Sequence, residues 1–274
     1  MIIETLSTFP DMYASVMGAS MMKRAQDKGI LDFCAYDLRD WTHDRHRTTD
    51  DDPFGGGAGL VMKCEPLFEA YEALCGIEPV TPRGSFPNEQ PRTGPAPRHT
   101  DDVRPKVVFL TPCGRPFDDA LAAELSREER LLFICGHYEG IDERAYALAD
   151  YCISLGDYVL TSGELASMVV IDAVVRKIDG VLSAPDGAFD ESFASGLLEY
   201  PQYTRPADFR GAKVPAVLLS GNHGAVARWR RERSLERTAQ LRPDLLERAP
   251  LSPSDWEFLK CCTRDGPGSA QALS

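Results

Sequence analysis

The sequence contains no long run of apolar residues. No segment approaches the roughly 18 consecutive apolar residues that a membrane-spanning helix needs, and the first residues, Met1 to Glu4, lack the basic leader of a secretory signal. The 274 residues are 43% hydrophobic and 26% charged, which is too apolar for a wholly disordered chain. We therefore expect a folded, soluble protein of the cytoplasm, built as one large domain or two smaller ones.

The cysteine spacing of a metal or disulfide site is also missing. Six of the eight cysteines stand singly, no C-x-x-C pair occurs, and the adjacent Cys261 and Cys262 would make a poor chelate. His43 and His46 are close in sequence but have no third ligand nearby. We therefore expect free, buried thiols in a reducing compartment and no metal-binding residues.

The chain has no excess of basic residues, and its net charge is −12. The charge is unevenly spread, because residues 198–274 carry a net +3 and the first 197 residues a net −15. This argues against a protein that coats nucleic acid, but it allows a nucleic-acid enzyme with a local basic surface. The Arg-rich segments 39–47 and 228–237 are the candidates for that surface. A solvated, charged face is the alternative for each.

Apolar runs of strand type alternate with helix-type patterns and predict an α/β domain with a mainly parallel sheet. Strands are expected at 1–9, 30–38, 107–110, 131–135 and 151–155, and helices at 11–28, 65–74, 119–130, 143–149 and 164–178. Residues 77–105 hold seven of the 20 prolines and predict an exposed, mobile insertion. Residues 183–197 indicate a linker, and 198–274 a small, largely helical domain.

Three glycine-containing loops follow predicted strands, at 110–114, 135–140 and 154–163. Parallel sheets bind ligands at the carboxyl ends of their strands, and glycine lets backbone approach a flat ligand. None of these loops contains the dinucleotide or P-loop fingerprint, so turn glycines and a ligand site are equally good interpretations. The Gly-rich run 55–59 lacks the strand-to-helix context of a phosphate cradle, and a hinge loop is the better interpretation.

Several sequence blocks occur in a fixed order: 42–47 (THDRHR), 52–57 (DPFGGG), 135–144 (CGHYEGIDER), 156–160 (GDYVL), 192–198 (SFASGLL), 203–206 (YTRP) and 220–223 (SGNH). Together they resemble the bacterial tRNA (guanine-N1)-methyltransferases, which methylate guanosine at position 37 beside the anticodon. The resemblance covers nearly the whole chain except the Pro-rich insertion and the last few residues. Such blocks in fixed order make the resemblance highly specific.

The resemblance implies a fold that periodicity alone would not select, because true knots are very rare. The family belongs to the trefoil-knotted SPOUT methyltransferases, so a C-terminal trefoil knot is expected within the N-terminal domain, residues 1–182. S-adenosylmethionine is implied as the methyl donor, bound largely by backbone of the knot loops. The resemblance also implies a homodimer in which each active site is shared by two chains, with residues 198–274 binding tRNA.

By match to the family, the cofactor-binding candidates come from the three glycine-containing loops. They are Leu110, Thr111 and Pro112; Gly136, Tyr138 and Glu139; and Ser154, Leu155, Gly156, Asp157, Tyr158, Val159, Leu160 and Gly163. Ser162 departs from the family, which usually has glycine there, but it removes no reacting group. Among residues that approach tRNA, the match indicates Arg45, Arg47 and the 228–237 segment, with Asp172 contacting the target base.

Methyl transfer to N1 of guanine requires a proton acceptor and control of the charge that builds on O6. The matching arginine is Arg176. The family places an aspartate directly before a Ser-Phe pair, where this chain has Glu191, with Asp190 one residue further back. Either carboxylate can serve, and we prefer Glu191 because its side chain is longer. An RNA-binding module that kept the fold but lost its base is the alternative, favoured only by this displaced carboxylate. Any Mg²⁺ is expected to come with the substrate.

Overall fold

The computed structural model describes residues 1–76, 103–182 and 191–264. The chain forms two compact units, Met1–Ser183 and Ala184–Ser274. Most of the predicted insertion, residues 77–102, lies outside the described residues, and so do residues 183–190 of the predicted linker. Within the described ranges, no helix is long and apolar enough to cross a membrane.

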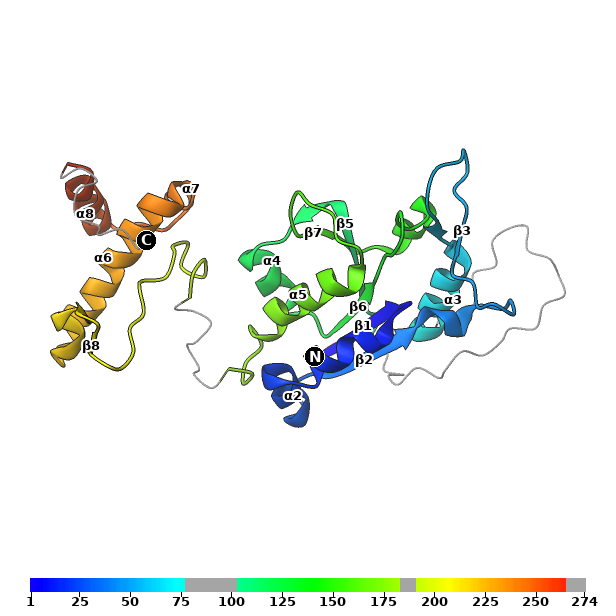
Figure 1. The fold of residues 1–274 in the computed structure, drawn as a ribbon, viewed down its shortest axis with the longest axis horizontal. Coiled ribbons are helices and arrows are strands. Elements are labelled where there is room, and N and C mark those ends of the chain that lie inside the picture. Colours follow the sequence, from blue (N-terminus) through cyan, green and yellow to red (C-terminus); the bar gives the residue numbers. More distant parts are fainter. Residues whose placement is uncertain (77–102, 183–190, 265–274) are drawn as a thin grey trace. The chain divides into compact units, whose positions relative to one another are not determined.

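The first unit is built on a five-stranded parallel sheet, in the order β2-β1-β6-β5-β7 (Figure 1). The strands are β1 (Ile2–Ser7), β2 (Asp32–Asp37), β5 (Lys106–Pro116), β6 (Arg130–Ile134) and β7 (Tyr151–Ser154). Every residue of the central strand β6 is buried, as expected for a parallel strand covered on both faces. The predicted α/β fold with a mainly parallel sheet is confirmed.

Helices cover both faces of this sheet. They are α1 (Ala14–Met17), α2 (Ser20–Asp27), α3 (Cys64–Cys75), α4 (Asp119–Leu125) and α5 (Gly163–Val175), with 3₁₀ helices η1 (Pro10–Tyr13), η2 (Leu38–Trp41) and η3 (Glu143–Leu148). Along β6, Leu131 and Phe133 join the core under α4 and α5, whereas Leu132 and Ile134 join the core under α3. The alternation follows from the period of two in a strand. A short hairpin, β3 (Asp50–Asp51) with β4 (Val61–Met62), lies between η2 and α3 in the chain.

The predicted helix at 11–28 is wrong in its continuity. The structure breaks it into η1, α1 and α2 at Gly18 and Ala19, where Ala19 adopts an extended backbone and Ser20 has a φ of 46°. A Cβ on Gly18 would lie 2.7 Å from the Ala14 oxygen, so glycine permits the tight end of α1. The predicted helix at 143–149 is instead the 3₁₀ helix η3.

The second unit contains the helices α6 (His223–Leu241), α7 (Pro243–Leu246) and α8 (Pro253–Arg264). A hairpin of β8 (Asp208–Phe209) and β9 (Ala212–Lys213) and the 3₁₀ helix η4 (Ala216–Leu219) precede them. Leu197, Leu235 and Leu259 form its buried core. The helical prediction is therefore right from His223 onward, whereas the described residues 191–222 contain no α-helix.

Candidate active site

The first predicted cofactor loop interrupts strand β5. Leu110 and Arg115 both pair with Ile153 of β7, so residues 111–114 are bypassed by the strand ladder, which resumes at Arg115. The predicted strand 107–110 therefore continues to Pro116 beyond the loop. A Cβ on Gly114 would lie 2.4 Å from the Ile153 nitrogen, so only glycine fits where the loop returns to the sheet.

The second loop, after β6, lies against the start of α5. The Gly163 nitrogen donates to the Gly136 oxygen at 2.8 Å, and His137 and Ser162 form an isolated antiparallel bridge. A Cβ on Gly163 would lie 2.6 Å from the Gly136 nitrogen, so the two backbones touch. The structure therefore brings together Gly136 and Gly163, which are both predicted cofactor-binding positions.

Gly59, the last residue of the Gly-rich run 55–59, contacts the second loop, which the sequence did not indicate. The Glu139 side chain packs over Gly59, where a Cβ would lie 2.4 Å from the Glu139 Cγ. The Glu139 nitrogen also donates to the Leu60 oxygen at 3.1 Å. Tyr138 has a φ of 59° and an exposed ring, so it is held in a left-handed conformation that non-glycine residues rarely adopt. Gly59 and Leu60 therefore lie against this loop.

The third loop, after β7, folds tightly on itself. The Gly156 nitrogen donates to the Ser154 Oγ at 3.3 Å, and the Tyr158 nitrogen donates to the Gly156 oxygen at 2.8 Å. Gly156 has a φ of 149°, and a Cβ there would lie 2.9 Å from the Tyr158 ring. Tyr158, Val159 and Leu160 remain exposed, as does Asp157. The loop thus presents apolar and aromatic side chains outward.

The predicted catalytic residues belong to different units. Arg176 is the C-cap of α5 in the first unit and is half-buried. Glu191 opens the described part of the second unit, and Asp190 lies outside the described residues. A tight turn follows Glu191, in which the Phe193 nitrogen donates to the Leu197 oxygen at 2.7 Å. Because Leu197 is buried in the core of the second unit, this turn anchors the segment that carries Glu191.

A neutral polar network lies beneath the second loop. The Tyr13 hydroxyl lies 3.0 Å from the Cys135 Sγ and 2.6 Å from the Ser167 Oγ. Burial raises the pKa of Cys135 to about 12 and also raises the pKa of Tyr13. Cys135 is therefore a thiol at neutral pH, which does not suit a nucleophile.

Each of the two Arg-rich segments contains both a guanidinium group paired with a carboxylate and an exposed arginine. In 39–47, Arg47 is paired with Asp40, while Arg45 is exposed. In α6, Arg231 pairs with Asp255 at 2.8 Å, whereas Arg230 lies over the Tyr200 ring at 4.7 Å.

Aromatic side chains accompany the exposed arginines of α6. The Tyr203 and Trp229 ring centroids lie 6.3 Å apart, and Tyr203 is exposed. Arg228, Arg230 and Arg237 are exposed on the same helix. Exposed guanidinium groups beside aromatic rings suit phosphates and unstacked bases.

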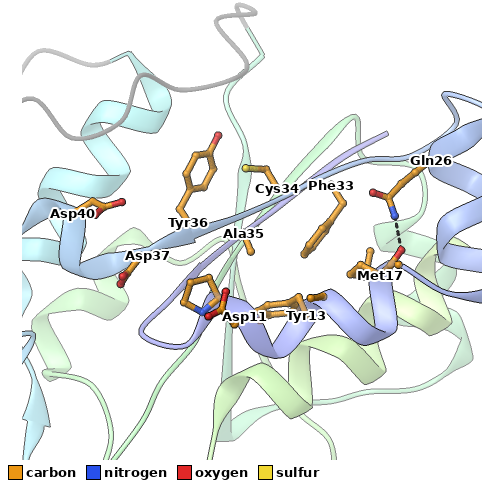
Figure 2. A pocket seen from close by; sticks show the side chains of 13 residues that line it. Asp11, Tyr13, Met17, Gln26, Phe33, Cys34, Ala35, Tyr36, Asp37 and Asp40 are labelled. Carbon is orange, nitrogen blue, oxygen red and sulfur yellow. Dashed lines mark hydrogen bonds between the residues drawn. The ribbon is translucent and has the colours of Figure 1, made fainter.

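A cavity of 570 Å³ lies along the edge strand β2, between that strand and η1–α1 (Figure 2). Tyr13, Phe33 and Tyr36 line it, together with the carboxylates Asp11 and Asp37. None of the predicted cofactor or catalytic residues lines this cavity. We therefore place the candidate site at the three loops, where backbone groups converge, and not in the cavity.

Within residues 1–76, 103–182 and 191–264, the structure contains no group of three or more His, Cys, Asp and Glu side chains that could hold a metal ion. The chain is thus an α/β protein with a parallel sheet and glycine-bearing loops at the carboxyl ends of its strands, which is where proteins of this class bind their ligands.

Comparison with known proteins identifies the family within this class. The family model described as "tRNA (Guanine-1)-methyltransferase TrmD" matches residues 1–248. A "tRNA (guanine-N(1)-)-methyltransferase" of Moorella thermoacetica is 49% identical over 263 residues, which are 96% of each chain. The protein of the same name from Caldanaerobacter subterraneus subsp. tengcongensis is 50% identical over 260 residues, 95% of this chain and 98% of its own. The chain belongs to the tRNA (guanine-1)-methyltransferase family, as the sequence motifs indicate.

Proposed function

We propose that this chain transfers the methyl group of S-adenosylmethionine to N1 of guanosine at position 37 of tRNA. The observation that carries the proposal is the gathering of three loops at one sheet edge, where Gly114, Gly136 and Gly163 allow close backbone contacts. The membership of the chain in a methyltransferase family also supports the proposal. The relatives described above are named tRNA (guanine-N(1)-)-methyltransferases.

The loops fit a cofactor with an adenine base and a cationic sulfur centre. Backbone N–H and C=O groups can read an adenine edge without a charged side chain, and the exposed Tyr138 and Tyr158 rings offer flat apolar contacts. S-adenosylmethionine supplies an electrophilic methyl group on its sulfonium sulfur. The residues that would hold it are those predicted from the sequence, in the loops 110–112, 136–139 and 154–163. We further propose that these loops form the trefoil knot of the family.

In the proposed reaction the chain supplies a base and a cation. Neutral guanine carries a proton on N1, so Glu191, or alternatively Asp190, would accept that proton. Negative charge develops on O6 as the proton leaves, and the guanidinium of Arg176 would stabilise it. The charge is lost when N1 takes the methyl group, because the methyl–sulfur bond breaks and its electron pair stays on the sulfur, which becomes a neutral thioether. A Mg²⁺ ion, where it takes part, would come with the substrate.

The exposed arginines of α6 are proposed to contact the tRNA phosphates, together with Arg45 and Arg47 of the first unit. Trp229 and Tyr203 would stack on unpaired bases next to these phosphates. Asp172, which is exposed one turn before the end of α5, is proposed to contact the target base. Because tRNA is a cytoplasmic substrate, we propose that the enzyme acts in the cytoplasm.

A homodimer is also proposed, with each active site shared by two chains. Helix α5 is apolar on more than the side that faces the core. Val170 and Val174 are fully buried, yet Leu165 and Val169 are 42% and 54% exposed. A helix that is apolar around most of its circumference is usually covered on all sides. A second copy of the chain would cover this exposed face.

Transfer of labelled methyl groups tests the activity directly. The purified protein is incubated with methyl-labelled S-adenosylmethionine and an unmodified tRNA transcript carrying guanosine at position 37, beside an adenosine-37 control. We expect label only in the guanosine transcript. Label in neither transcript, with binding of both cofactor and tRNA intact, would instead support the RNA-binding module that lost its base.

A further inference from the structure

Two buried polar atoms face each other beneath the second loop without forming a hydrogen bond. The Nε2 of His137 and the Oε2 of Glu164 are 3.6 Å apart, and neither has a hydrogen-bond partner among the described residues. Glu164 is fully buried, and only 17% of the His137 side chain is exposed. A buried carboxylate oxygen without a partner is costly, so this arrangement is expected to change when the site is in use.

The rest of the Glu164 carboxylate is already fixed. Its Oε1 accepts a hydrogen bond from the Ser7 Oγ at 2.5 Å, and Ser7 in turn accepts from the Phe9 nitrogen at 2.8 Å. Because the end of β1 holds one oxygen, the other keeps a constant direction toward the second loop. Glu164 therefore acts as a rigid acceptor, and His137 is the group that can move.

No other described side chain donates to the open oxygen of Glu164. Tyr13 and Cys135 lie close to it, but burial raises the pKa of each, and both are neutral at physiological pH. The imidazole of His137 is thus the group placed to donate to the open oxygen. The Phe9 ring packs against this imidazole with centroids 4.7 Å apart and an angle of 51° between the rings.

His137 also begins the turn that carries two predicted cofactor residues. The Gly140 nitrogen donates to the His137 oxygen at 3.1 Å, and Tyr138 inside the turn has its φ of 59°. The far side of the turn is fixed, because the Glu139 nitrogen bonds the Leu60 oxygen. A hydrogen bond from the His137 side chain to Glu164 would therefore hold the near side of the turn as well.

We propose that His137 is a positioning residue, which donates from Nε2 to the Oε2 of Glu164 when the cofactor binds and so fixes Tyr138 and Glu139 in the cofactor pocket. The proposal rests on the proposed function, because it requires the second loop to contact S-adenosylmethionine. A charge-assisted hydrogen bond spans about 2.7–2.9 Å, so a movement of less than about 1 Å closes the gap.

Binding of S-adenosylmethionine to variants, measured by calorimetry, tests this pair. We expect His137→Leu to weaken cofactor binding about 10-fold, and His137→Gln, whose amide can donate from a similar position, to stay within about 3-fold of the wild type. We expect the loss to appear in the KM for S-adenosylmethionine more than in kcat. His43→Gln is the matched control, because His43 pairs with Glu69 at 2.6 Å on the exposed surface.

Coupling between the two residues is measured by adding Glu164→Gln to His137→Leu. We expect the double variant to bind cofactor within about 2-fold of His137→Leu, because the shared interaction is already lost. Nitrogen-15 spectra of the imidazole give a readout that does not depend on turnover or on variants. Addition of cofactor to the wild type should shift the His137 Nε2 resonance to a hydrogen-bonded position.

The outcomes separate this proposal from the proposed function. A wild-type protein that binds no S-adenosylmethionine contradicts the proposed function and this proposal with it. A wild type that binds cofactor, combined with a His137→Leu variant of unchanged affinity, contradicts the positioning role alone. Should His137→Leu fail to fold, an Nε2 resonance that does not move on cofactor binding overturns the proposal in the wild-type protein.

Discussion

Glu191 and Asp190 are adjacent, so separate amide substitutions identify the base. We expect Glu191→Gln to lower the rate of methyl transfer by about 10²–10⁴-fold, because proton acceptance by a positioned group contributes about that much. Asp190→Asn should keep a rate within several-fold of the wild type. Single-turnover methylation at saturating cofactor and tRNA measures both. The reverse result would assign the base to Asp190.

The lowered pKa of Asp255 makes the stability of the second unit change with pH in the acid range. The hydrogen bonds from Arg231, with bonds from Ser252, hold the pKa of Asp255 at about 2, below its ordinary value of 3.8. Since the folded-state pKa is the lower one, the pair stabilises the unit above about pH 4, and the stabilisation is lost as the pH falls through about 2.

The substitution Asp255→Asn should therefore lower the free energy of unfolding of the second unit by about 1–2 kcal/mol at neutral pH, with the exposure of Arg231 limiting the effect. The difference from the wild type should shrink between about pH 4 and pH 2. Hydrogen exchange of amides in α6 and α8 measures it. A difference that stays constant over this range would contradict the assigned pKa.

At the scale of the element, α5 starts with a side-chain cap. The Ser162 Oγ accepts from the Leu165 nitrogen at 3.5 Å, so Ser162 is the N-cap of the helix. We expect Ser162→Ala to destabilise the first unit by about 1 kcal/mol and Ser162→Gly by only a few tenths. Thermal unfolding measures both variants, and a Ser162→Ala protein as stable as the wild type would show that the cap contributes nothing.

The elements that the sequence predicts well are those with a long, uniform apolar pattern. The Leu131–Cys135 run gives a strand that is displaced by one residue, and the apolar residues after Glu164 give α5. The helix at 11–28 fails because Gly18 ends one helix and the extended Ala19 separates it from the next, which periodicity does not register. The return of β5 to the sheet at Arg115 depends on pairing with Ile153, a partner distant in sequence.

The candidate site was predictable where it consists of sequence motifs and not where it consists of side-chain contacts. The glycines of the three loops are visible as motifs, and the structure places Gly136 against Gly163. Glu139 packs on Gly59, and His137 approaches Glu164. Both contacts join residues that are distant in sequence, so no local sequence pattern predicts them. The roles of Glu191 and Arg176 come from the family resemblance and remain predictions.

At the scale of the whole molecule, the exposed face of α5 makes the assembly testable. We expect Val169→Glu to convert a dimer into monomers, because a carboxylate would be buried without a partner in the proposed interface. Val16→Glu, on the exposed surface of α1, is the matched control. Sedimentation of both variants gives their masses, and a wild-type monomer or a dimeric Val169→Glu protein would exclude this interface.

The position of β1 in the sheet has a consequence for the protein while it is being made. One edge of β1 pairs with β2, where Ile2 lies opposite Asp32, but its other edge pairs with β6, where Ile2 lies opposite Arg130. At about 5–20 residues per second, a ribosome that has added Asp32 needs several seconds or more to reach Arg130. Until then the strand that pairs with this edge of β1 does not exist, so the edge has no β6 partner to pair with. The parallel sheet of the first unit can therefore be completed only after β6 has been made.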